Sequence, residues 1–311
     1  MRYYEHPESF LSYAEVVPAV EEAFANHCEG EVQMPPKVYI TFPDGDFRTM
    51  PAYIPALDIA GVKIVNVHPH NRAAGLPTVM ALTVVIDIDT GAPAALLNAT
   101  RLTDMRTGAA GAVATKYLKP VPNIVLGLIG SGRQAEAQLE AIANVCTIEE
   151  IRVWSRDPAN AEAFLARYPR FEGRTGTIEQ VCDCDVLCTT TPSRTPLVRD
   201  EWIREGMHIN AIGADAPGKQ ELDPALLLRA RVYVDDYEQA THSGEINVPI
   251  SSGLYSRSMI AGTLGEAVCG KVKRMSRDEI TVFDSTGLAL QDLAIAKIAL
   301  RHGASMEIPF P

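Results

Sequence analysis

The sequence has no long apolar run. Its longest apolar stretches, such as residues 79–86, fall well short of the roughly 18 residues that suggest a membrane-spanning helix. The first eight residues, Met-Arg-Tyr-Tyr-Glu-His-Pro-Glu, contain no apolar segment typical of a secretion signal. We therefore expect a soluble cytoplasmic protein without a membrane partner.

Positive charge is also scarce. The 311 residues include 28 Lys and Arg against 39 Asp and Glu, which gives a net charge of −11. Nucleic acids are polyanions that bind basic patches, so this balance argues against a nucleic-acid partner. With 47% hydrophobic and 22% charged residues, the composition is that of an ordinary globular protein, and the length allows two domains.

The spacing of cysteine and histidine typical of metal sites is missing as well. Cys182, Cys184 and Cys188 lie close together, but none of them forms the Cys-x2-Cys pair of a zinc site. The residues around Cys188 are apolar enough to form a buried strand. His68 and His70 are neighbours without an obvious third ligand. We expect no metal site, and the sequence shows no internal repeat or low-complexity tract.

The first 118 residues contain short β-patterned segments separated by turns. We predict strands at 38–42, 61–67, 81–87 and 93–97, followed by a helix at 99–118. Strands that follow each other without helices favour an antiparallel or mixed sheet. A capping-box spacing at Ser12 and Glu15 predicts an earlier helix, in which Pro18 favours a kink or a later start.

From residue 123 onward, apolar strand-like segments alternate with helical ones. We predict strands at 124–129, 151–154, 185–190, 208–212, 231–234 and 280–283. Such an alternation is typical of a doubly wound parallel sheet, whose strands are buried on both faces. A last helix, at 287–301, has a broad apolar face with which it could return to the N-terminal part.

A glycine-rich fingerprint lies between the first of these strands and the next predicted helix. Gly130-Ser-Gly132-Arg-Gln-Ala135 matches the G-x-G-x-x-A pattern. Its glycines allow a tight turn and a close approach of the backbone to a pyrophosphate at a helix N-terminus. The strand before it and the helix after it are the context that this motif requires. The sequence therefore predicts dinucleotide binding.

The residues about twenty positions further on bear on the choice of cofactor. An acid at this place usually binds the ribose hydroxyls of NAD, but the chain has Ser155 and Arg156 there. Both side chains suit the 2′-phosphate of NADP. Alternatively, Arg156 is solvated and Asp157 only caps the next helix. The cofactor is therefore NAD or NADP.

Four charged residues are candidates for the chemistry. Arg48, Lys63 and Arg106 lie among apolar or small residues, where a charge normally needs a partner such as an anionic ligand. A solvated strand position is the alternative, above all for Arg48. Asp215 follows the predicted strand at 208–212, at the end where ligands of open α/β sheets bind, and a carboxylate there suits proton transfer.

These motifs resemble those of the ornithine cyclodeaminase/mu-crystallin family, most closely its alanine dehydrogenase branch typical of archaea. The matching stretches, in order, are Met34–Lys37, Gly45–Ala52, Gly61–Pro69, Gly75–Ala81, Met105–Gly111, Cys188–Arg194, Ile209–Lys219, His242–Val248 and Phe283–Gly287. The resemblance implies an α/β protein in which a Rossmann domain, residues 119–289, is inserted in a substrate-binding and dimerisation domain, residues 1–118 and 290–311. It also implies a homodimer.

The resemblance assigns roles to individual residues. It implies that Lys63 contacts the substrate, that Arg106 lies between substrate and cofactor, and that Asp215 donates and accepts protons. Lys37 and Arg48 match substrate-site positions. Together with the fingerprint, the expected cofactor contacts are Thr78, Arg106, Gly130, Gly132, Arg133, Gln134, Ser155, Arg156, Thr191, Lys219 and Ser285.

Position 48 favours a small substrate. The ornithine cyclodeaminases of the family carry an acid where this chain has Arg48, and a cation there would repel the distal amino group of ornithine. We expect reversible NAD(P)-dependent oxidative deamination of L-alanine to pyruvate and ammonia. The alternatives are an ornithine cyclodeaminase, an NADPH-dependent reductase of a cyclic imine such as pyrroline-2-carboxylate, or a dinucleotide-gated ligand binder without activity. Ser155 replaces an acid of the alanine dehydrogenase branch, which suits the imine reductase.

Overall fold

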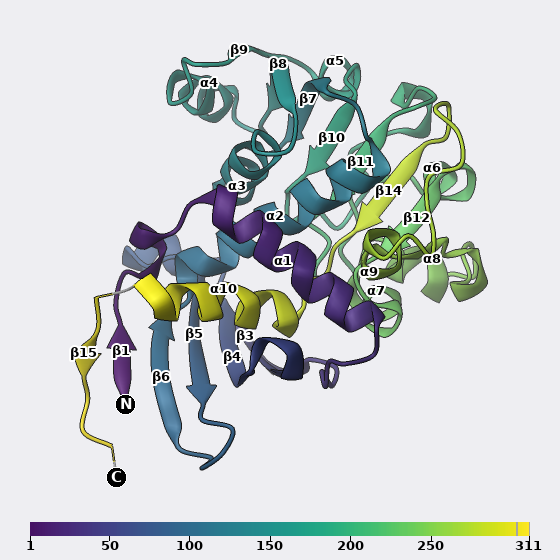
Figure 1. The fold of residues 1–311 in the computed structure, drawn as a ribbon. Coiled ribbons are helices and arrows are strands. Elements are labelled where there is room, and N and C mark those ends of the chain that lie inside the picture. Colours follow the sequence, from purple (N-terminus) through teal and green to yellow (C-terminus); the bar gives the residue numbers. More distant parts are fainter. Residues whose placement is uncertain (303, 311) are drawn as a thin grey trace. The chain divides into compact units, whose positions relative to one another are not determined.

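The computed structural model describes residues 1–302 and 304–310. The chain divides into two units: unit 1 is Met1–Arg106 with Leu288–Pro311, and unit 2 is Thr107–Gly287 (Figure 1). The sequence-based boundary after residue 118 differs from this division, which falls inside helix α2 (Thr100–Leu118), because that helix begins in unit 1 and ends in unit 2. In the described part of the chain, no helix has both the length and the apolar character needed to cross a membrane.

Unit 1 contains a seven-stranded mixed sheet in the order β15-β1-β6-β5-β4-β3-β2. Its strands pair antiparallel except for β1 and β6, which run parallel. The mixed sheet expected from the turn pattern is thus confirmed, although the sequence did not predict β1 or β15. The elements are β1 (Arg2–Tyr4), η1 (Pro7–Phe10), α1 (Tyr13–Cys28), β2 (Val38–Phe42), β3 (Gly45–Ile54), η2 (Pro55–Leu57), β4 (Ile59–Val67), η3 (Asn71–Ala74), β5 (Val79–Ile86), β6 (Pro93–Asn98), α10 (Ala289–His302) and β15 (Met306–Glu307).

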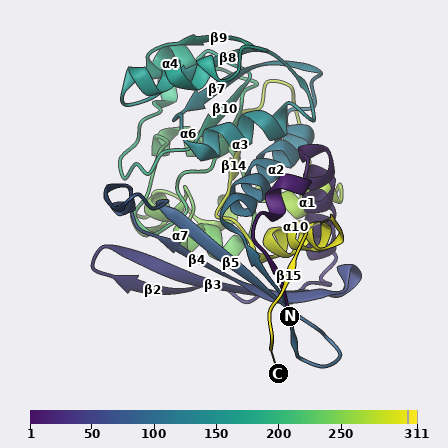
Figure 2. The ribbon, with the colours of Figure 1, turned by 90° about the vertical axis from the view of Figure 1, so that its left-hand side faces the viewer.

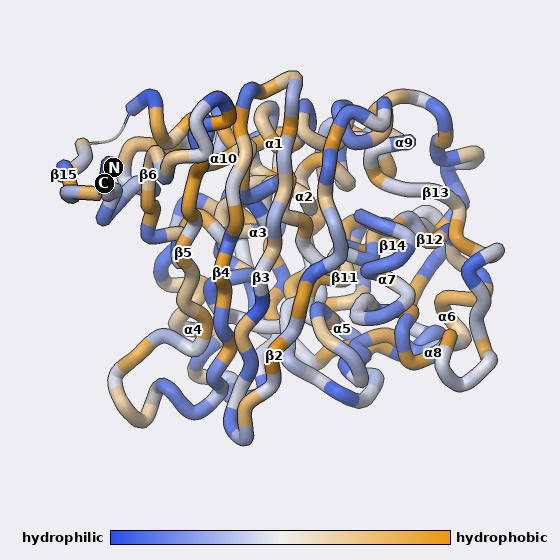
Figure 3. Tube along the Cα trace, turned by 90° about the horizontal axis from the view of Figure 1, so that it is seen from below, coloured by the Kyte–Doolittle hydropathy of each residue, from blue (hydrophilic) through white to orange (hydrophobic). Residues whose placement is uncertain are grey.

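One face of this sheet is covered by helix. Helix α10 packs on β3, β4 and β5, and α1 packs on α10 (Figures 1 and 2). Because side chains alternate along a strand, every second residue of β3 faces this layer and is buried, among them Arg48, Met50 and Ala52. In Figure 3, which colours each residue by hydropathy, the strands of this sheet contain orange apolar segments as well as blue hydrophilic ones. The other face of the sheet carries exposed apolar side chains.

Helix α1 begins where its capping box predicts. The backbone N–H and the hydroxyl of Ser12 donate to Glu15 Oε2 at 3.1 and 2.7 Å. Pro18 lies inside the helix, so the expectation of a later start is wrong. The proline removes one hydrogen bond in the second turn, but Val16, Val20 and Phe24 bury an apolar face that offsets this loss.

Unit 2 is a doubly wound α/β unit around an eight-stranded parallel sheet, in the order β13-β12-β14-β11-β10-β7-β8-β9. The predicted doubly wound sheet is confirmed. The elements are β7 (Asn123–Ile129), α3 (Arg133–Ile142), β8 (Thr147–Trp154), α4 (Pro158–Ala166), β9 (Glu172–Thr175), α5 (Ile178–Cys182), β10 (Val186–Thr189), η4 (Asp200–Trp202), β11 (His208–Ala211), α6 (Pro224–Arg229), β12 (Arg231–Val234), α7 (Tyr237–Ser243), α8 (Asn247–Ser251), η5 (Arg257–Met259), β13 (Gly262–Thr263), α9 (Leu264–Val268) and β14 (Thr281–Asp284).

The strand order reverses between β7 and β10. From β7 the chain continues outward through β8 and β9, and then returns to β10 on the other side of β7. The carboxyl ends of β7 and β10 therefore flank the point from which successive loops diverge. Ligands of open α/β sheets bind in this crevice, so the fold places a candidate cofactor site there.

Candidate active site

A buried lysine lies in the middle of the covered face of unit 1. Lys63, on β4, is 1% exposed, and its Nζ donates to Asp292 Oδ1 on α10 at 2.7 Å. The partner comes from 229 residues further along the chain. Helix α10 thus supplies the carboxylate that a buried ammonium group needs.

Arg106, near the middle of α2, shares the same carboxylate. Its Nε lies 3.1 Å from Asp292 Oδ1, an ion pair without hydrogen-bond geometry, and its Nη1 donates to Gln291 Oε1 at 2.7 Å. Within the described structure, the buried Asp292 Oδ2 and Gln291 Nε2 have no hydrogen-bond partner. We call Lys63, Arg106, Gln291 and Asp292 the cation cluster. It joins two cations to one carboxylate and contains polar atoms that could still bind a ligand.

The surroundings of Lys63 favour its neutral form. The pKa of Lys63 is lowered from 10.5 to about 7: burial is the largest cause, the nearby charges of Arg106 and Lys37 act in the same direction, and Asp292 opposes them. A lysine with a pKa near neutrality can both release and accept a proton at physiological pH. This property is what a group that exchanges protons with a substrate requires.

Arg48 lies on the same face of the sheet. In the antiparallel pairing of β3 with β4, Arg48 lies opposite Val65, and Met50 lies opposite Lys63. Arg48 and Lys63 are therefore diagonal neighbours on adjacent strands. The Arg48 side chain is 5% exposed, and its Nε donates to Asp46 Oδ1 at 2.8 Å. The alternative of a solvated position is therefore wrong for Arg48. All three cations singled out in the sequence are buried, including Arg48, for which the sequence left a solvated position open.

The phosphate loop of unit 2 has the geometry that the fingerprint predicts. Gly130 follows β7 with a φ of 114°, and a Cβ at this position would lie 2.5 Å from Thr190 Oγ1. Gly132 is the N-cap of α3, and a Cβ there would meet no atom within 4 Å. The space above the first turn of α3, which begins with Arg133 and Gln134, is thus open to a phosphate group.

The other expected cofactor contacts of unit 2 lie at the carboxyl ends of its strands. Ser155 and Arg156 follow β8, where Gly130 N–H donates to the carbonyl of Trp154 at 2.8 Å. Asp157 caps α4 by accepting a hydrogen bond from Ala159 N–H, as the alternative interpretation expected. Ser285 follows β14, and its buried Oγ has no partner among the described residues. A buried hydroxyl without a protein partner at this edge is available to bind a cofactor.

Asp215 and Lys219 occupy the loop after β11. Lys219 Nζ pairs with Asp215 Oδ1 at 2.5 Å, and both side chains are partly exposed. Thr191, after the neighbouring β10, donates its N–H and hydroxyl to Glu221 Oε1, each at 2.7 Å. Thr78 lies in unit 1, before β5, where its carbonyl accepts a hydrogen bond from His68 N–H.

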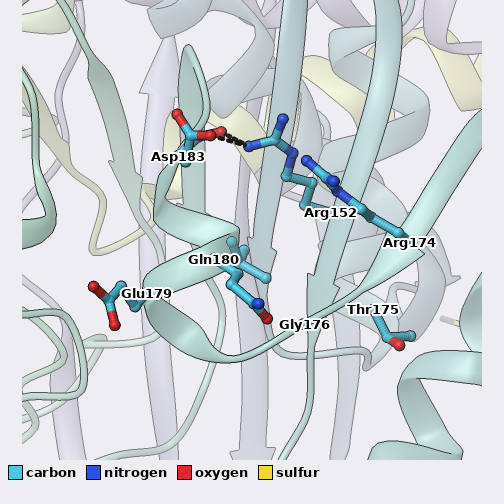
Figure 4. Close-up of a pocket in the computed structure, with 8 residues that line it drawn as sticks. Arg152, Arg174, Thr175, Gly176, Glu179, Gln180 and Asp183 are labelled. Atoms are coloured by element: carbon cyan, nitrogen blue, oxygen red, sulfur yellow. Dashed lines mark hydrogen bonds and ion pairs between the residues drawn. The ribbon is translucent and has the colours of Figure 1, made fainter.

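A cavity of about 350 Å³ elsewhere in unit 2 does not coincide with these residues (Figure 4). It lies between β8, β9 and α5. Arg152 pairs with Asp183 Oδ2 at 2.9 Å and with Glu150 Oε2 at 2.9 Å, and Arg174 pairs with Glu150 Oε1 at 2.6 Å. Because both arginines already have acidic partners, neither offers an uncompensated positive charge to an anionic ligand.

Comparison with known proteins identifies the family. The model of the ornithine cyclodeaminase/mu-crystallin family matches residues 1–303. The chain belongs to this family. A family relative, the alanine dehydrogenase of Archaeoglobus fulgidus, is 48% identical over 308 residues, which are 98% of this chain and 95% of that protein.

Two solved structures of the family share the whole fold. An archaeal alanine dehydrogenase dimer with bound NAD has a TM-score of 0.93 and 45% identity, and the match covers 99% of each chain. The Δ1-pyrroline-2-carboxylate reductase of Thermococcus litoralis, in complex with NADH and L-proline, has a TM-score of 0.95 and 35% identity. That match covers 99% of this chain and 100% of the reductase. The resemblance seen in the sequence motifs is thus confirmed.

The structure also adds residues that the sequence did not indicate. Gln291 and Asp292 complete the cation cluster, although the helix at 287–301 was described only by its apolar face. An amide and an acid at buried positions of an otherwise apolar helix were the available signal. The roles of the other candidate residues stay predictions, because a substrate or cofactor is needed to test them.

Proposed function

We propose that this protein catalyses the reversible NAD(P)-dependent oxidative deamination of L-alanine to pyruvate and ammonia. The cation cluster is the observation that carries this proposal. Lys63, Arg106 and the nearby Lys37 exceed the single carboxylate of Asp292 in charge, which suits the carboxylate of a small amino acid. The identity of 48% with an alanine dehydrogenase supports the substrate.

The cofactor in this proposal is a nicotinamide dinucleotide bound at the carboxyl edge of the unit 2 sheet. Gly130, Gly132 and the N-terminus of α3 would hold its pyrophosphate, and Ser285 would supply a hydroxyl. Bound there, the nicotinamide would accept the hydride from Cα of alanine. Ser155 and Arg156 are compatible with NAD and with NADP, so the preference is a matter for direct assay.

The residues of the chain would then manage charge and protons. Arg106, with Arg48 or Lys37, binds the substrate carboxylate. After loss of hydride, the amino acid becomes an iminium ion, water adds to its Cα, and the resulting carbinolamine releases ammonia to leave pyruvate. Lys63 exchanges a proton at its Nζ because its pKa is about 7. Asp215 accepts protons from the amine or the carbinolamine.

The decisive assay is cofactor reduction across small amino acids, with NAD and NADP measured in parallel. Activity with L-alanine, and the reverse reaction with pyruvate and ammonium, would support the proposal. Turnover of ornithine alone would contradict it and indicate a cyclodeaminase. Cofactor binding without turnover of any amino or imino acid would indicate a ligand binder.

Reduction of a cyclic imine is the second candidate. The similarity to the Thermococcus litoralis reductase over the whole chain supports it, as does the Ser155-Arg156 pair in place of an acid. The two reactions differ in their need for ammonium. Reduction of a pyrroline-2-carboxylate without ammonium, at a higher rate than that of pyruvate with ammonium, would favour the reductase.

We also propose that two copies of the chain assemble through the open face of the unit 1 sheet. Val38, Thr49, Ile64 and Leu82 lie in one row across β2, β3, β4 and β5, on the face opposite Lys63. Val38, Ile64 and Leu82 are 56, 39 and 43% exposed. A row of exposed apolar residues on a sheet is typical of an interface. The archaeal alanine dehydrogenase of similar structure is a dimer.

A further inference from the structure

Unit 2 buries a group of acids that have no role in the reaction described so far. Glu221, Glu245 and Asp284 are each 0% exposed. All three accept hydrogen bonds from backbone N–H groups in the loops at the carboxyl edge of the parallel sheet. We call them the carboxylate chain, because Asp284 accepts a hydrogen bond from the backbone N–H of Glu245, and Glu245 accepts one from the backbone N–H of Glu221.

Glu221 connects the loops that follow β10 and β11. Its Oε1 accepts hydrogen bonds from Thr191 N–H and the Thr191 hydroxyl, each at 2.7 Å, and its Oε2 accepts one from Gly213 N–H at 2.9 Å. A Cβ at Gly213 would overlap the Glu221 carboxylate, so glycine is required at this contact. A single side chain thus fixes the starts of two neighbouring loops.

Glu245 and Asp284 hold Glu221 from behind. Glu245 Oε1 accepts hydrogen bonds from the N–H groups of Glu221 and Leu222 at 2.9 and 2.7 Å. Asp284, at the end of β14, accepts hydrogen bonds from Glu245 N–H at 2.8 Å and Ile246 N–H at 3.1 Å. The chain of contacts runs from the centre of the sheet to the loop that contains Asp215.

The same loop is also held near its other end. Asn247, at the start of α8, accepts a hydrogen bond from Gly218 N–H at 2.9 Å and donates one to the carbonyl of Lys219 at 3.0 Å. The segment from Gly213 to Glu221 is therefore fixed on both sides of the Asp215–Lys219 ion pair. Its conformation is set by buried side chains: Glu221 at its own end, and Glu245 and Asn247 from outside the loop.

Such an arrangement adds little to stability by itself. Burial raises the pKa of Glu245 well above its usual value, and the charge of Glu221 raises it further; burial also raises the pKa of Glu221. Buried charges can often be replaced by apolar side chains without loss of stability, whereas removal of one hydrogen-bonded partner disturbs the geometry. The carboxylate chain therefore defines a conformation more than it contributes to the free energy of folding.

We propose that Glu221, Glu245 and Asn247 are positioning residues, which hold the 213–221 loop so that Asp215 and Lys219 are placed for the reaction. The kinetic part of this inference rests on the proposed function, in which Asp215 exchanges protons. The structural part does not, because it concerns the loop itself.

Hydrogen exchange tests the structural part. In Glu221→Gln, the side-chain amide group would face either Gly213 N–H or Thr191 N–H, so one acceptor contact is lost. We expect faster deuterium uptake in the peptide that covers residues 213–222. Asp185→Asn is the matched control, because Asp185 accepts a hydrogen bond from Val125 N–H at 2.9 Å in the same unit, before β10. This variant should leave uptake at 213–222 unchanged. Wild-type uptake in folded Glu221→Gln would overturn the proposal.

Kinetics with Asp215→Asn test whether Glu221 acts through Asp215. Alone, Glu221→Gln should lower kcat by about 10-fold or more, as displacement of a reacting group does, with less change in the KM of the cofactor. In the Asp215→Asn background it should lower kcat little further, because the residue that it positions is already lost. Independent, multiplicative losses would contradict a positioning role.

A second variant covers the case in which Glu221→Gln does not fold. Asn247→Ala releases Gly218 and Lys219 without altering a buried acid. It should make uptake faster and lower kcat, as Glu221→Gln does. Full kcat in Asp215→Asn, combined with faster uptake in Glu221→Gln, would reject the proposed role of Asp215 and support the loop-holding role of Glu221. If Glu221→Gln does not fold, wild-type uptake in Asn247→Ala would reject the loop-holding role instead.

Discussion

The two units bury charges of opposite sign and compensate them in different ways. In unit 1, Lys63 and Arg106 are compensated by a side chain, the carboxylate of Asp292, which they share. In unit 2, Glu221 and Glu245 are compensated by backbone N–H groups. Backbone amides are fixed by the fold, whereas a side-chain ion pair can rearrange when a charged ligand arrives. Unit 1 is therefore suited to respond to a substrate, and unit 2 to hold a fixed geometry.

Burial has the same physical effect in both units, with different consequences. It favours the neutral form of each group, so the pKa of Lys63 falls and the pKa of Glu245 rises. The pKa of Lys63 reaches about 7, where proton exchange is useful to an enzyme. This difference agrees with the proposal that the cation cluster of unit 1 exchanges protons and the carboxylate chain of unit 2 positions a loop.

The largest expected effect concerns Lys63 and Asp215, one from each unit. Lys63→Ala and Asp215→Asn should each lower kcat by about 10²-fold or more, the usual contribution of a general acid or base. If both serve one transition state, the double variant should be scarcely worse than either single one. Steady-state kinetics measure this, with cofactor affinity as the control, since neither residue is proposed to hold the pyrophosphate. Near-normal turnover of Lys63→Ala would remove that residue from the mechanism.

Asp292→Asn should have the next largest effect, because it leaves two buried cations without a charged partner. We expect a loss of about 3 kcal/mol in the free energy of unfolding, measured by urea denaturation. Asp292 raises the pKa of Lys63, so its removal should lower that pKa and move the acidic limb of the kcat/KM profile to lower pH. Lys297→Met, at a more exposed ion pair of the same helix, should change neither quantity. If the acidic limb of the kcat/KM profile does not shift, Lys63 is not the group whose protonation determines it.

The pH dependence of stability should have opposite signs in the two units. Between about pH 7 and 10.5, the folded chain has lost the Lys63 proton that the unfolded chain retains, so this group makes stability rise with pH. Above the ordinary pKa of 4.5, Glu245 retains a proton that the unfolded chain has lost, so this group makes stability fall with rising pH. Thermal unfolding across pH should show that Lys63→Met flattens the rise and Glu245→Gln flattens the fall. Unchanged slopes in both variants would contradict these protonation states.

The smallest effect on activity is expected at the open face of the unit 1 sheet. Ile64→Asp places a charge in the apolar row and should convert a dimer to monomers, as measured by sedimentation at micromolar concentration, with little loss of protomer stability. Leu228→Asp is the control on unit 2, since Leu228 is 52% exposed on α6 and outside the row. A wild-type chain that sediments as a monomer would rule out the proposed dimer.

Much of the fold follows from local sequence patterns. Alternation of apolar residues predicted most strands of unit 1, and apolar runs separated by helical segments predicted the parallel sheet of unit 2 apart from its short strands β9 and β13. These predictions succeed because the period of burial is a property of a few neighbouring residues. The Gly130–Gly132 fingerprint was predictable for the same reason, since the strand, turn and helix that it needs are consecutive. The short strands β1 and β15 were not, because they form by pairing with distant segments: β1 pairs with β6 and β15, and β15 pairs with β1.

The candidate site was predictable only in part. Lys63 and Arg106 were identified as buried cations because their apolar neighbours stand beside them in the sequence. Their shared partner Asp292 was not identified, since it lies 229 residues from Lys63 and reaches it only when α10 packs on β4. The carboxylate chain likewise depends on loops that follow different strands. The sequence by itself indicated that Lys63 and Arg106 are cations among apolar residues, whereas the tertiary structure decided which groups compensate them, because compensation depends on distances that packing alone defines.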